Sequence, residues 1–404
     1  MYLKEVNSRK SAREFLDLPR NLYKNDPFWV CPQDKDIITQ FDSLKNPFFE
    51  NGEAKRWILK SHEGKPIGRI AAFYNDERAK AEKVPTGGCG FFECIDDRKA
   101  AFLLFDTAAT WLRSKGMKAM DAPINFGEND SQWGLLVEGF THPGMGMPYN
   151  FPYYRDLFES YGFEIFFKQF SYHLDLRKPF PERFWKIAEW IGKKPDFHFQ
   201  HFTWKEADRF IKDTVQIYSE AWSVFKEDFT PLKEKTLKNS MEKARPIIDP
   251  EMIWFAYHKE KPVAFFIMMP DVNQILKELN GKMHIINMLR FIIMKKNKKI
   301  NRIRALAAGV VPKFQNSGVE SGIFWHMNEK MKFKPWYEEI ELSWVGDYNP
   351  KMIALYEAVG GVRSKIHHTY RFMLDKSIAF ERFMPEKVES KITTLHEKKH
   401  IQKS

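Results

Sequence analysis

Cysteine is scarce in this chain of 404 residues, and long apolar runs are absent from it. The three cysteines, Cys31, Cys89 and Cys94, are too few for a disulfide framework and suit a reducing cytoplasm. No stretch approaches the ~20 apolar residues that a membrane span needs. Residues 1–6 show no apolar core of a secretion signal. These absences favour a cytoplasmic protein.

Several catalytic and metal-binding motifs are also missing. Residues 87–90 are rich in glycine but lack the Lys-Ser/Thr of a P-loop, and no nucleophile elbow is visible. Cys89 and Cys94 are expected on opposite faces of one strand, because side chains alternate along a strand. His367 and His368 are adjacent and face opposite ways for the same reason, with no carboxylate at ligand spacing. We therefore expect no metal site.

The composition is that of a folded protein with an uneven charge. Hydrophobic residues make up 43% of the chain and aromatic residues 15%, which excludes disorder over most of its length. A chain this long can form two domains, each with its own core. The net charge of +11 is concentrated between residues 274 and 304, where nine Lys and Arg accompany one acid, Glu278.

This basic segment joins an apolar run, residues 285–294, to the lysine cluster of residues 295–299. Three interpretations stay open. It is a solvated insertion whose apolar face packs on its own domain, a peripheral contact with an anionic membrane through residues 284–304, or a surface for an acidic partner. Nucleic acid is not expected, because the basic residues are not interleaved with stacking aromatics over a wide face.

The chain repeats itself after about 198 residues. Residues 154–163 align without a gap with residues 352–361, and each segment predicts a short amphipathic helix that ends at glycine and precedes a β-rich run. A second similarity relates residues 64–73 to residues 260–267. Each segment has a Lys-Pro turn between two expected strands. A repeat this long indicates two similar domains, since the units of a solenoid span roughly 20–50 residues.

Hydrophobic periodicity and cap residues place the expected elements. In the first copy we expect strands at 56–60, 67–74, 90–94 and 119–124, a helix that follows Asp96 and Asp97 and ends near Gly116, a helix at 153–161 and a strand at 168–176. In the second copy we expect a helix at 207–222, strands at 253–257, 263–269 and 303–311, a helix carrying Ile323 to Met331, a strand at 339–345, a helix at 350–359 and a strand at 366–374.

The stretch from residue 305 to 322 carries the strongest chemical signal. A strand ends in a turn of small residues and opens a helix, whose first N–H groups and positive end can hold a pyrophosphate. This turn resembles the acyl-CoA-binding element of the GNAT superfamily of N-acyltransferases, which reads Gln/Arg-x-x-Gly-x-Gly/Ala. Gln315 and Gly318 match its first and fourth positions, and Glu320 stands at the sixth, where a small residue is usual.

Residues 347–361 are similar to a second element of that family, an Asn-x-x-Ala-x-x-x-Tyr-x-x-x-Gly-Phe helix. The resemblance implies that Asn349 binds the cofactor arm and that Tyr356 protonates the departing thiolate. A plain helix cap for Asn349 and a core aromatic for Tyr356 stay open as alternatives. The resemblance implies acetyl-CoA or another acyl-CoA, bound by Val310, Val311, Gln315, Asn316, Ser317, Gly318, Val319 and Asn349.

The implied reaction is the direct attack of an amine on a thioester. It needs a neutral amine, an N–H donor for the developing oxyanion and a proton for the sulfur. The strand at residues 309–311 could supply the donor. Glu341 and Asp347 are the candidate bases beside Tyr356, with a water chain, or a purely structural role for Glu341, as alternatives.

The first copy lacks the phosphate-binding turn, because residues 92–98 contain no glycine and include Asp96 and Asp97. We interpret this copy as a scaffold and an acceptor site. Its long polar loop supplies the candidate substrate-binding residues Asn125, Glu128, Asp130, Trp133, His142 and Tyr149. The alternative is a surface loop held by its own Asx turns.

Over residues 50–375 the chain resembles bacterial tandem-GNAT proteins, and the same duplication occurs in N-myristoyltransferases and Fem-type aminoacyl transferases. The resemblance implies an α/β (α+β) fold of two tandem GNAT-like domains, each a mixed, mostly antiparallel sheet flanked by helices. We place the first domain at residues 1–195, the second at 196–375 with an insertion at about 272–303, and a polar basic tail at 376–404.

The hypothesis is an acyl-CoA-dependent N-acyltransferase acting on a small-molecule or peptide amine. Two alternatives remain. Glu320 favours a non-catalytic protein that binds a ligand, and the basic insertion would suit an aminoacyl transferase of the Fem type, docking charged tRNA.

Overall fold

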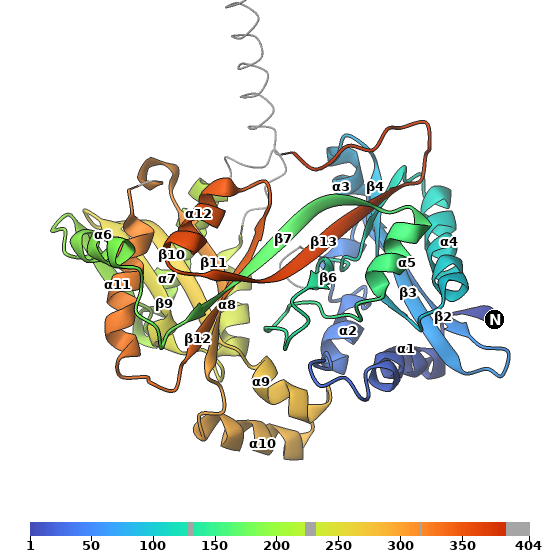
Figure 1. The fold of residues 1–404 in the computed structure, drawn as a ribbon, viewed down its shortest axis with the longest axis horizontal. Helices are drawn as coiled ribbons and strands as arrows, with labels where there is room; N and C mark the ends of the chain where they lie inside the picture. The colour runs from blue at the N-terminus through green and yellow to red at the C-terminus, as the bar shows by residue number, and fades with distance from the viewer. Residues whose placement is uncertain (128–131, 223–231, 316, 385–404) are drawn as a thin grey trace, which may run out of the picture. The chain divides into compact units, whose positions relative to one another are not determined.

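The structure is a computed structural model that describes residues 1–127, 132–222, 232–315 and 317–384 (Figure 1). The chain forms two compact units. Among the described residues, the first contains 1–170, 273–297 and 364–383, and the second contains 171–272, 298–363 and 384. Glu128, Asp130 and Asn316, three of the predicted site residues, lie outside the described residues.

The first unit is built on a sheet in which strands follow the order β1-β2-β3-β4-β5-β13, and β6 also pairs with β13. All of these pairs are antiparallel except β4 with β5. The strands are β1 (Tyr2–Glu5), β2 (Gly52–Lys60), β3 (Pro66–Asn75), β4 (Thr86–Cys94), β5 (Ala119–Ala122), β6 (Leu135–Glu138) and β13 (Val362–Met373). The α-helices are α1 (Arg9–Leu22), α2 (Asp34–Gln40), α3 (Asp76–Ala81), α4 (Arg98–Ser114), α5 (Tyr154–Tyr161), α9 (Asn273–Leu276) and α10 (Ile285–Lys296).

Two apolar layers hold this sheet between helices. On one face, Leu104 and Phe105 of α4 and Phe158 of α5 are fully buried in the larger core. On the other face, Phe15 of α1 packs with Phe126 in a smaller cluster. Helix α4 begins where the sequence predicted, because the Asp97 carboxylate accepts from the N–H groups of Lys99 and Ala100 at 2.8 and 3.2 Å.

The second unit repeats this plan with strands in the order β12-β11-β10-β9-β8. Only β11 and β12 are parallel. The strands are β8 (Phe197–His201), β9 (Ile253–His258), β10 (Lys261–Pro270), β11 (Arg302–Val310) and β12 (Glu339–Gly346). The α-helices are α6 (Glu182–Gly192), α7 (Ala207–Trp222), α8 (Glu234–Ala244), α11 (Val319–Met331) and α12 (Pro350–Ala358). Short 3-10 turns occur at Pro47–Phe49, Trp204–Glu206, Pro250–Met252, Lys277–Leu279 and Pro312–Phe314.

Each copy donates its last strand to the other unit. The final part of β13 belongs to the first unit, where Tyr370 pairs with Ala122 and Met373 with Ala119. The final residues of β7 (Glu164–Asp175) belong to the second unit and lie beside β12. There the N–H of Leu176 donates to the carbonyl of Glu338 at 2.8 Å.

The mixed α/β architecture predicted from sequence is confirmed, and the expected strands and helices are present to within a few residues. The ranges 1–195 and 196–375 remain a description of the repeat along the chain, since the compact units exchange strands across that boundary. The insertion is divided as well, because residues 273–297 pack in the first unit.

One prediction about the cysteines is wrong. Cys89 and Cys94 both lie in the core beneath α4 instead of on opposite faces. Between them Phe91 has a φ of 52°, and the register of β4 against β3 shifts between Arg69 and Ala71. This β-bulge adds one residue to the strand. The side chains of Cys89 and Cys94, five positions apart, therefore point to the same face of the sheet. All three cysteines are free and buried.

Candidate functional site

Strands β11 and β12 separate toward their carboxyl ends in the second unit. Their parallel register runs from the pair Arg302 and Glu339 to the pair Arg304 and Glu341. Beyond it β11 continues to Val310 and β12 to Gly346. The Ser343 hydroxyl donates to the carbonyl of Leu306 over 3.5 Å. One backbone edge of β11 therefore faces the gap between the strands.

The backbone of β11 is shaped by a bulge at Leu306. Opposite this residue the register with β10 shifts, since Ile267 pairs with Ala307 and Met268 with Ala305. At the strand end the N–H of Val311 donates to the carbonyl of Val263 on β10 at 3.0 Å. Successive N–H groups of a strand point in opposite directions, so the N–H of Val310 faces the β12 side. Within residues 309–311, where the sequence predicted an oxyanion donor, the N–H of Val310 is thus directed at the gap and that of Val311 is engaged in the sheet.

The turn after β11 is held by two hydrogen bonds between residues close in sequence. The Gln315 side-chain amide donates to the Val310 carbonyl at 3.3 Å, and the N–H of Val319 donates to the Ser317 hydroxyl at 3.4 Å. Gly318 caps α11 with a φ of 79°, a left-handed conformation that favours glycine. Gln315 thus stabilises the strand end, while Gly318 turns the chain into the helix.

Helix α6 packs against the first turns of α11. A Cβ at Gly318 would lie 3.4 Å from the side chain of Ile191, and one at Gly322 would lie 2.5 Å from the ring of Phe199. Gly322 is therefore explained by the packing of β8 beneath the helix. Gly318 is explained by its backbone conformation.

Glu320 lies at the N-terminal end of α11, where the free N–H groups of a helix can bind an anion. It lies in the first turn of α11, and its carboxylate accepts from its own backbone N–H. Burial raises the pKa of Glu320, and the bond from its own amide lowers it by less. The conformation of the turn fits an anion, and Glu320 is the residue that does not fit, because a carboxylate repels a phosphate.

Tyr356 and Asn349 lie on α12, as the repeat predicted. Tyr356 is buried, and its ring lies edge-on to that of Tyr172 with the centroids 5.4 Å apart. Burial, and then the neighbouring Tyr172, raise the pKa of Tyr356 above its ordinary value. Asn349 is exposed and accepts from the N–H of Met352 at 3.3 Å, as a helix cap does. A further contact of Asn349 with a cofactor stays a prediction.

The two candidate bases lie in different surroundings. Glu341 is buried on β12, 4.0 Å from a guanidinium nitrogen of Arg302, which also binds the buried Asp271 at 2.6 Å. This ion-pair cluster gives Glu341 a structural partner. Asp347 is half-buried just after β12, where burial and the Asp347 charge raise the pKa of Tyr348 to about 12.

The equivalent gap in the first unit is filled by backbone. Strands β4 and β5 pair from Thr86 and Ala119 to Gly88 and Asp121. The N–H of Ile124 then donates to the carbonyl of Cys89 at 3.0 Å, and a Cβ at Gly90 would collide with the Ile124 carbonyl. The first copy therefore lacks both the phosphate-binding turn and the opening beside its fourth strand.

The predicted acceptor residues of the first unit are held in several ways. Tyr149 donates its hydroxyl to the carboxylate of Asp26 at 2.9 Å. Asn125 is buried, and His142 is half-buried in the same loop. The indole N–H of Trp133 is buried and finds no hydrogen-bond acceptor among the described residues. A role in substrate binding stays a prediction for all of them.

A buried polar cluster in the first unit was not predicted from the sequence. The Glu93 carboxylate accepts from the hydroxyls of Tyr23 and Tyr154, each at 2.8 Å, and lies 3.5 Å from the guanidinium of Arg69. Burial raises the pKa of Glu93, and the Arg69 charge lowers it by less. The four residues come from separate elements. The only signal in the sequence was an acid within an apolar strand.

A second polar feature is a pocket of about 310 Å³ in the second unit, lined by His198, Gln200, Glu206, Arg209, Asp213, Tyr257 and Glu260. Arg209 donates to Tyr257 and Gln200 at 2.9 Å, and Tyr257 donates to Asp213 at 2.6 Å. These bonds connect four of the lining side chains, while the Nε of Arg209 is buried without a hydrogen-bond partner among the described residues. Within the described ranges, no cluster of His, Cys, Asp and Glu could hold a metal ion, and no helix is long and apolar enough to cross a membrane.

Two curated relatives each match 90% of this chain. No protein-family model matches the chain. It is 26% identical over 370 residues to the bacterial ceramide synthase of Caulobacter vibrioides (strain NA1000 / CB15N), covering 90% of this chain and 95% of that protein. It is 24% identical over 385 residues to protein YghO of Escherichia coli (strain K12), covering 90% and 93%.

Solved structures resemble the fold at low identity. A tandem GNAT protein from the clavulanic acid biosynthesis pathway matches with a TM-score of 0.54 and 12% identity, over 92% of this chain and 99% of that one. A GCN5-related glucosamine N-acetyltransferase region of a fungal multi-domain β-N-acetylglucosaminidase matches with the same TM-score, over 92% of this chain and 38% of that one. With one parallel strand pair in each copy of the repeat, β4 with β5 and β11 with β12, this chain has the fold of a tandem GNAT protein.

Proposed function

We propose that this protein transfers an acyl group from acyl-CoA to the amine of a long-chain amino alcohol. The observation that carries the proposal is the 26% identity to a bacterial ceramide synthase, which extends over 90% of this chain. A ceramide is the amide of a fatty acid with a long-chain amino alcohol. The fold supports acyl-CoA as the acyl donor, because the similar solved structures are GNAT proteins.

The second unit would bind the donor. The N–H of Val310 is directed at the gap between β11 and β12, where it can donate to the thioester carbonyl oxygen as negative charge develops there. The turn at Ser317 and Gly318 would hold the pyrophosphate on the N-terminus of α11. Glu320 must turn away from its own amide for this to happen, which makes it the residue that limits donor affinity.

The chemical step forms one bond and breaks one. The neutral amine nitrogen attacks the thioester carbon, the C–N bond forms, and the C–S bond breaks with its electron pair on sulfur. The Tyr356 hydroxyl donates a proton to that sulfur, and its raised pKa keeps it protonated at neutral pH. The proton lost by the amine goes to a base, for which Asp347 is favoured over Glu341, because Glu341 lies in the cluster of Arg302 and Asp271.

The proposal is tested by titration and by product analysis. We expect isothermal titration with acetyl-CoA and with longer acyl-CoAs to show binding that strengthens with chain length. Incubation with a long-chain acyl-CoA and sphinganine should release free CoA thiol and an N-acyl amide detected by mass spectrometry. If none of these thioesters binds, the proposal fails. If they bind but only short amines are acylated, the acceptor class is wrong.

One observation favours a second function. The Glu320 carboxylate already accepts from the amide that a phosphate would use, as expected of a copy that no longer binds CoA. In that case the protein would bind a ligand without turning over a thioester. Calorimetry with acyl-CoA on the parent protein and on Glu320→Ala separates the two proposals.

A further inference from the structure

Helix α10 turns its apolar side chains outward. Seventeen large hydrophobic side chains are exposed among the described residues, and six of them lie in this helix of 12 residues. They are Ile285, Ile286, Met288, Leu289, Ile292 and Ile293, with exposed fractions of 44–77%. The buried members of the helix are Asn287 and Phe291. The expectation that the apolar run packs on its own domain is therefore wrong for most of its residues.

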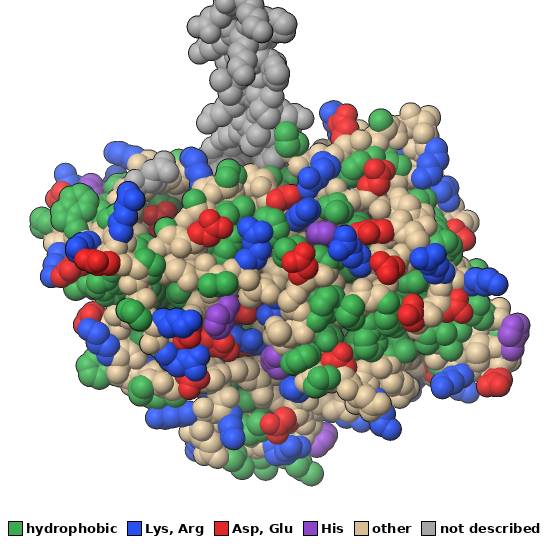
Figure 2. All heavy atoms as spheres, viewed as in Figure 1, with side chains coloured by type: hydrophobic (Ala, Val, Ile, Leu, Met, Phe, Trp, Pro, Cys, Tyr) green, Lys and Arg blue, Asp and Glu red, His purple; other side chains and the backbone are tan. Residues whose placement is uncertain are grey.

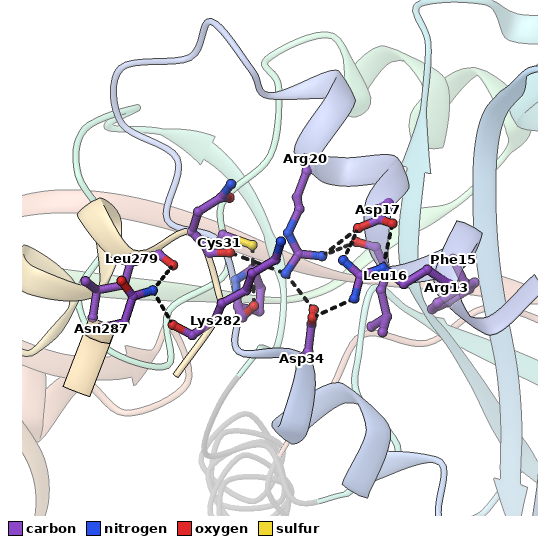
Figure 3. A network of polar contacts seen from close by, with 12 residues as sticks. Arg13, Phe15, Leu16, Asp17, Arg20, Cys31, Asp34, Leu279, Lys282 and Asn287 are labelled. Carbon is purple, nitrogen blue, oxygen red and sulfur yellow. Dashed lines mark hydrogen bonds and ion pairs between the residues drawn. The ribbon is translucent and has the colours of Figure 1, made fainter. Parts of the chain in front are cut away.

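The helix is held to the first unit by polar contacts, so its outward face does not result from poor attachment. The Asn287 side-chain amide donates to the carbonyls of Leu279 and Lys282 at 3.2 and 2.7 Å (Figure 3). In the preceding turn, the carbonyl of Gly281 accepts from the N–H of Asp34 at 3.2 Å. The Asp34 carboxylate in turn accepts from Arg20 at 2.5 Å (Figure 3).

The turn is fixed by shape as well. A Cβ at Gly281 would lie 2.5 Å from the carbonyl oxygen of Pro32, so the chain passes close against the segment between α1 and α2. Upstream, the Asn273 side-chain amide donates to the carbonyls of Pro143 and Gly144 at 3.2 and 3.0 Å. The base of the insertion is therefore anchored at two places, and α10 presents a defined face.

Basic residues surround that apolar face. At 3.6 residues per turn, Arg290 and Lys295 fall on opposite sides of it and Lys296 lies at its C-terminal end. Lys282 precedes the helix, and Lys298 and Lys299 follow it. Figure 2 shows hydrophobic and basic side chains together at the lower edge of the view, where Figure 1 places α10.

We propose that α10 docks this protein on an anionic lipid bilayer. With 12 residues the helix is about 18 Å long, too short to span a membrane but sufficient to lie in its interface. The apolar side chains would enter the boundary between headgroups and acyl chains, and the flanking Lys and Arg would meet lipid phosphates. A second copy of the chain suits this face less well, because a two-fold contact would bring like charges together.

Vesicle flotation with the full-length protein tests the proposal without substrate, so it does not depend on the proposed acyl transfer. We expect binding to vesicles of phosphatidylcholine with phosphatidylglycerol and little binding to phosphatidylcholine alone. Arg290→Gln with Lys296→Gln should weaken binding about fivefold for each charge removed. Leu289→Gln with Ile293→Gln should abolish it, with thermal unfolding unchanged because both side chains are exposed.

Matched controls lie outside α10. Phe333→Gln removes an exposed aromatic ring, and Lys186→Gln removes an exposed charge, and both should bind vesicles as the parent does. The proposal is overturned if the parent does not bind anionic vesicles, or if the α10 variants bind as well as the parent. It is also overturned if sedimentation shows a dimer that Leu289→Gln with Ile293→Gln splits while vesicle binding is unaffected.

Discussion

Arg371 and Asp121 form a two-pronged ion pair across strands that lie far apart in the sequence. The Arg371 Nε and Nη2 atoms donate to the two carboxylate oxygens of Asp121 at 2.7 and 2.9 Å, and both side chains are buried. The residues are direct register partners on β13 and β5. The last strand of the chain is thus fastened to the first unit by charge as well as by its ladder.

Breaking this pair should strongly destabilise the fold. We expect Asp121→Asn to lower the free energy of unfolding by up to about 3–5 kcal/mol, because it leaves the buried guanidinium with only the more exposed Glu82, at 2.8 Å, as its counter-ion. Arg155→Gln, which breaks the exposed pair with Glu159, should change it by less than about 1 kcal/mol. Chemical denaturation measures both. Equal effects would show that burial does not strengthen the Arg371 pair.

The strand exchange predicts that the copies do not fold alone. A fragment of residues 1–195 lacks β13, which pairs with β5 and β6 in the first unit. Expressed alone it should show no cooperative thermal transition. Co-expression with residues 196–404 should restore a folded complex of the two fragments. A cooperative transition in the isolated fragment would contradict this interpretation.

Substitution of Glu320 should change acyl-CoA affinity in a direction that is unusual for a site residue. Glu320→Ala removes a carboxylate from the N-terminus of α11, so we expect calorimetry to show binding tightened by about tenfold or more. Glu329→Ala, in the last turns of the same helix, is the control and should have no effect. Gly318→Glu should abolish binding. If parent and Glu320→Ala both fail to bind, the ligand-binding alternative without CoA is favoured.

The pH dependence of stability should also change at Glu320. Burial raises its pKa in the folded protein above the ordinary 4.5, so its neutral form is favoured by folding. Its contribution is fully present below that ordinary value and is lost as the pH rises through the raised pKa. Glu320→Gln, which stays neutral, should therefore melt at a higher temperature than the parent at neutral pH and at the same temperature near about pH 4. Thermal melts across this range give the comparison, and parallel curves would refute it.

Tyr356 should act in the reaction and not in binding. Tyr356→Phe should leave acyl-CoA affinity unchanged and lower kcat by about 10²–10⁴-fold, because a general acid is removed. Tyr172→Phe removes the hydroxyl of the neighbouring ring and should have little effect on kcat. A Tyr356→Phe variant with full turnover would exclude this tyrosine from the mechanism. An equal loss in Tyr172→Phe would assign the effect to packing.

The sequence predicted most of the elements, because strand alternation, glycine stops and caps such as Asp97 are local signals. It did not predict the irregularities within strands or which strands pair with each other. β-Bulges such as those at Phe91 and Leu306 add a residue without a sequence pattern of their own, and the bulge at Phe91 is why the two cysteines were placed on opposite faces. The sequence also did not predict the strand exchange, since the pairing of β13 with β5 joins residues that lie far apart in the chain.

The candidate site was predictable only in part. Gln315, Gly318 and Tyr356 stand close enough in sequence to form motifs, and the structure places them on the strand end and helices where the motifs put them. The cluster around Glu93 was not predictable, because Tyr23, Arg69 and Tyr154 come from three other elements. The surroundings of Glu341 depend on Asp271, which lies 70 positions away in the sequence.

The exchanged strands make each copy of the repeat depend on the other for a complete sheet. Ile124 closes its opening, so this copy could not bind the proposed donor in the way the second copy would. Its chain nevertheless supplies the end of β7 to the second unit and receives β13 in return. Loss of the first copy would leave the second sheet without a strand. The first copy is thus required for the stability of the second, whether or not it binds a ligand itself.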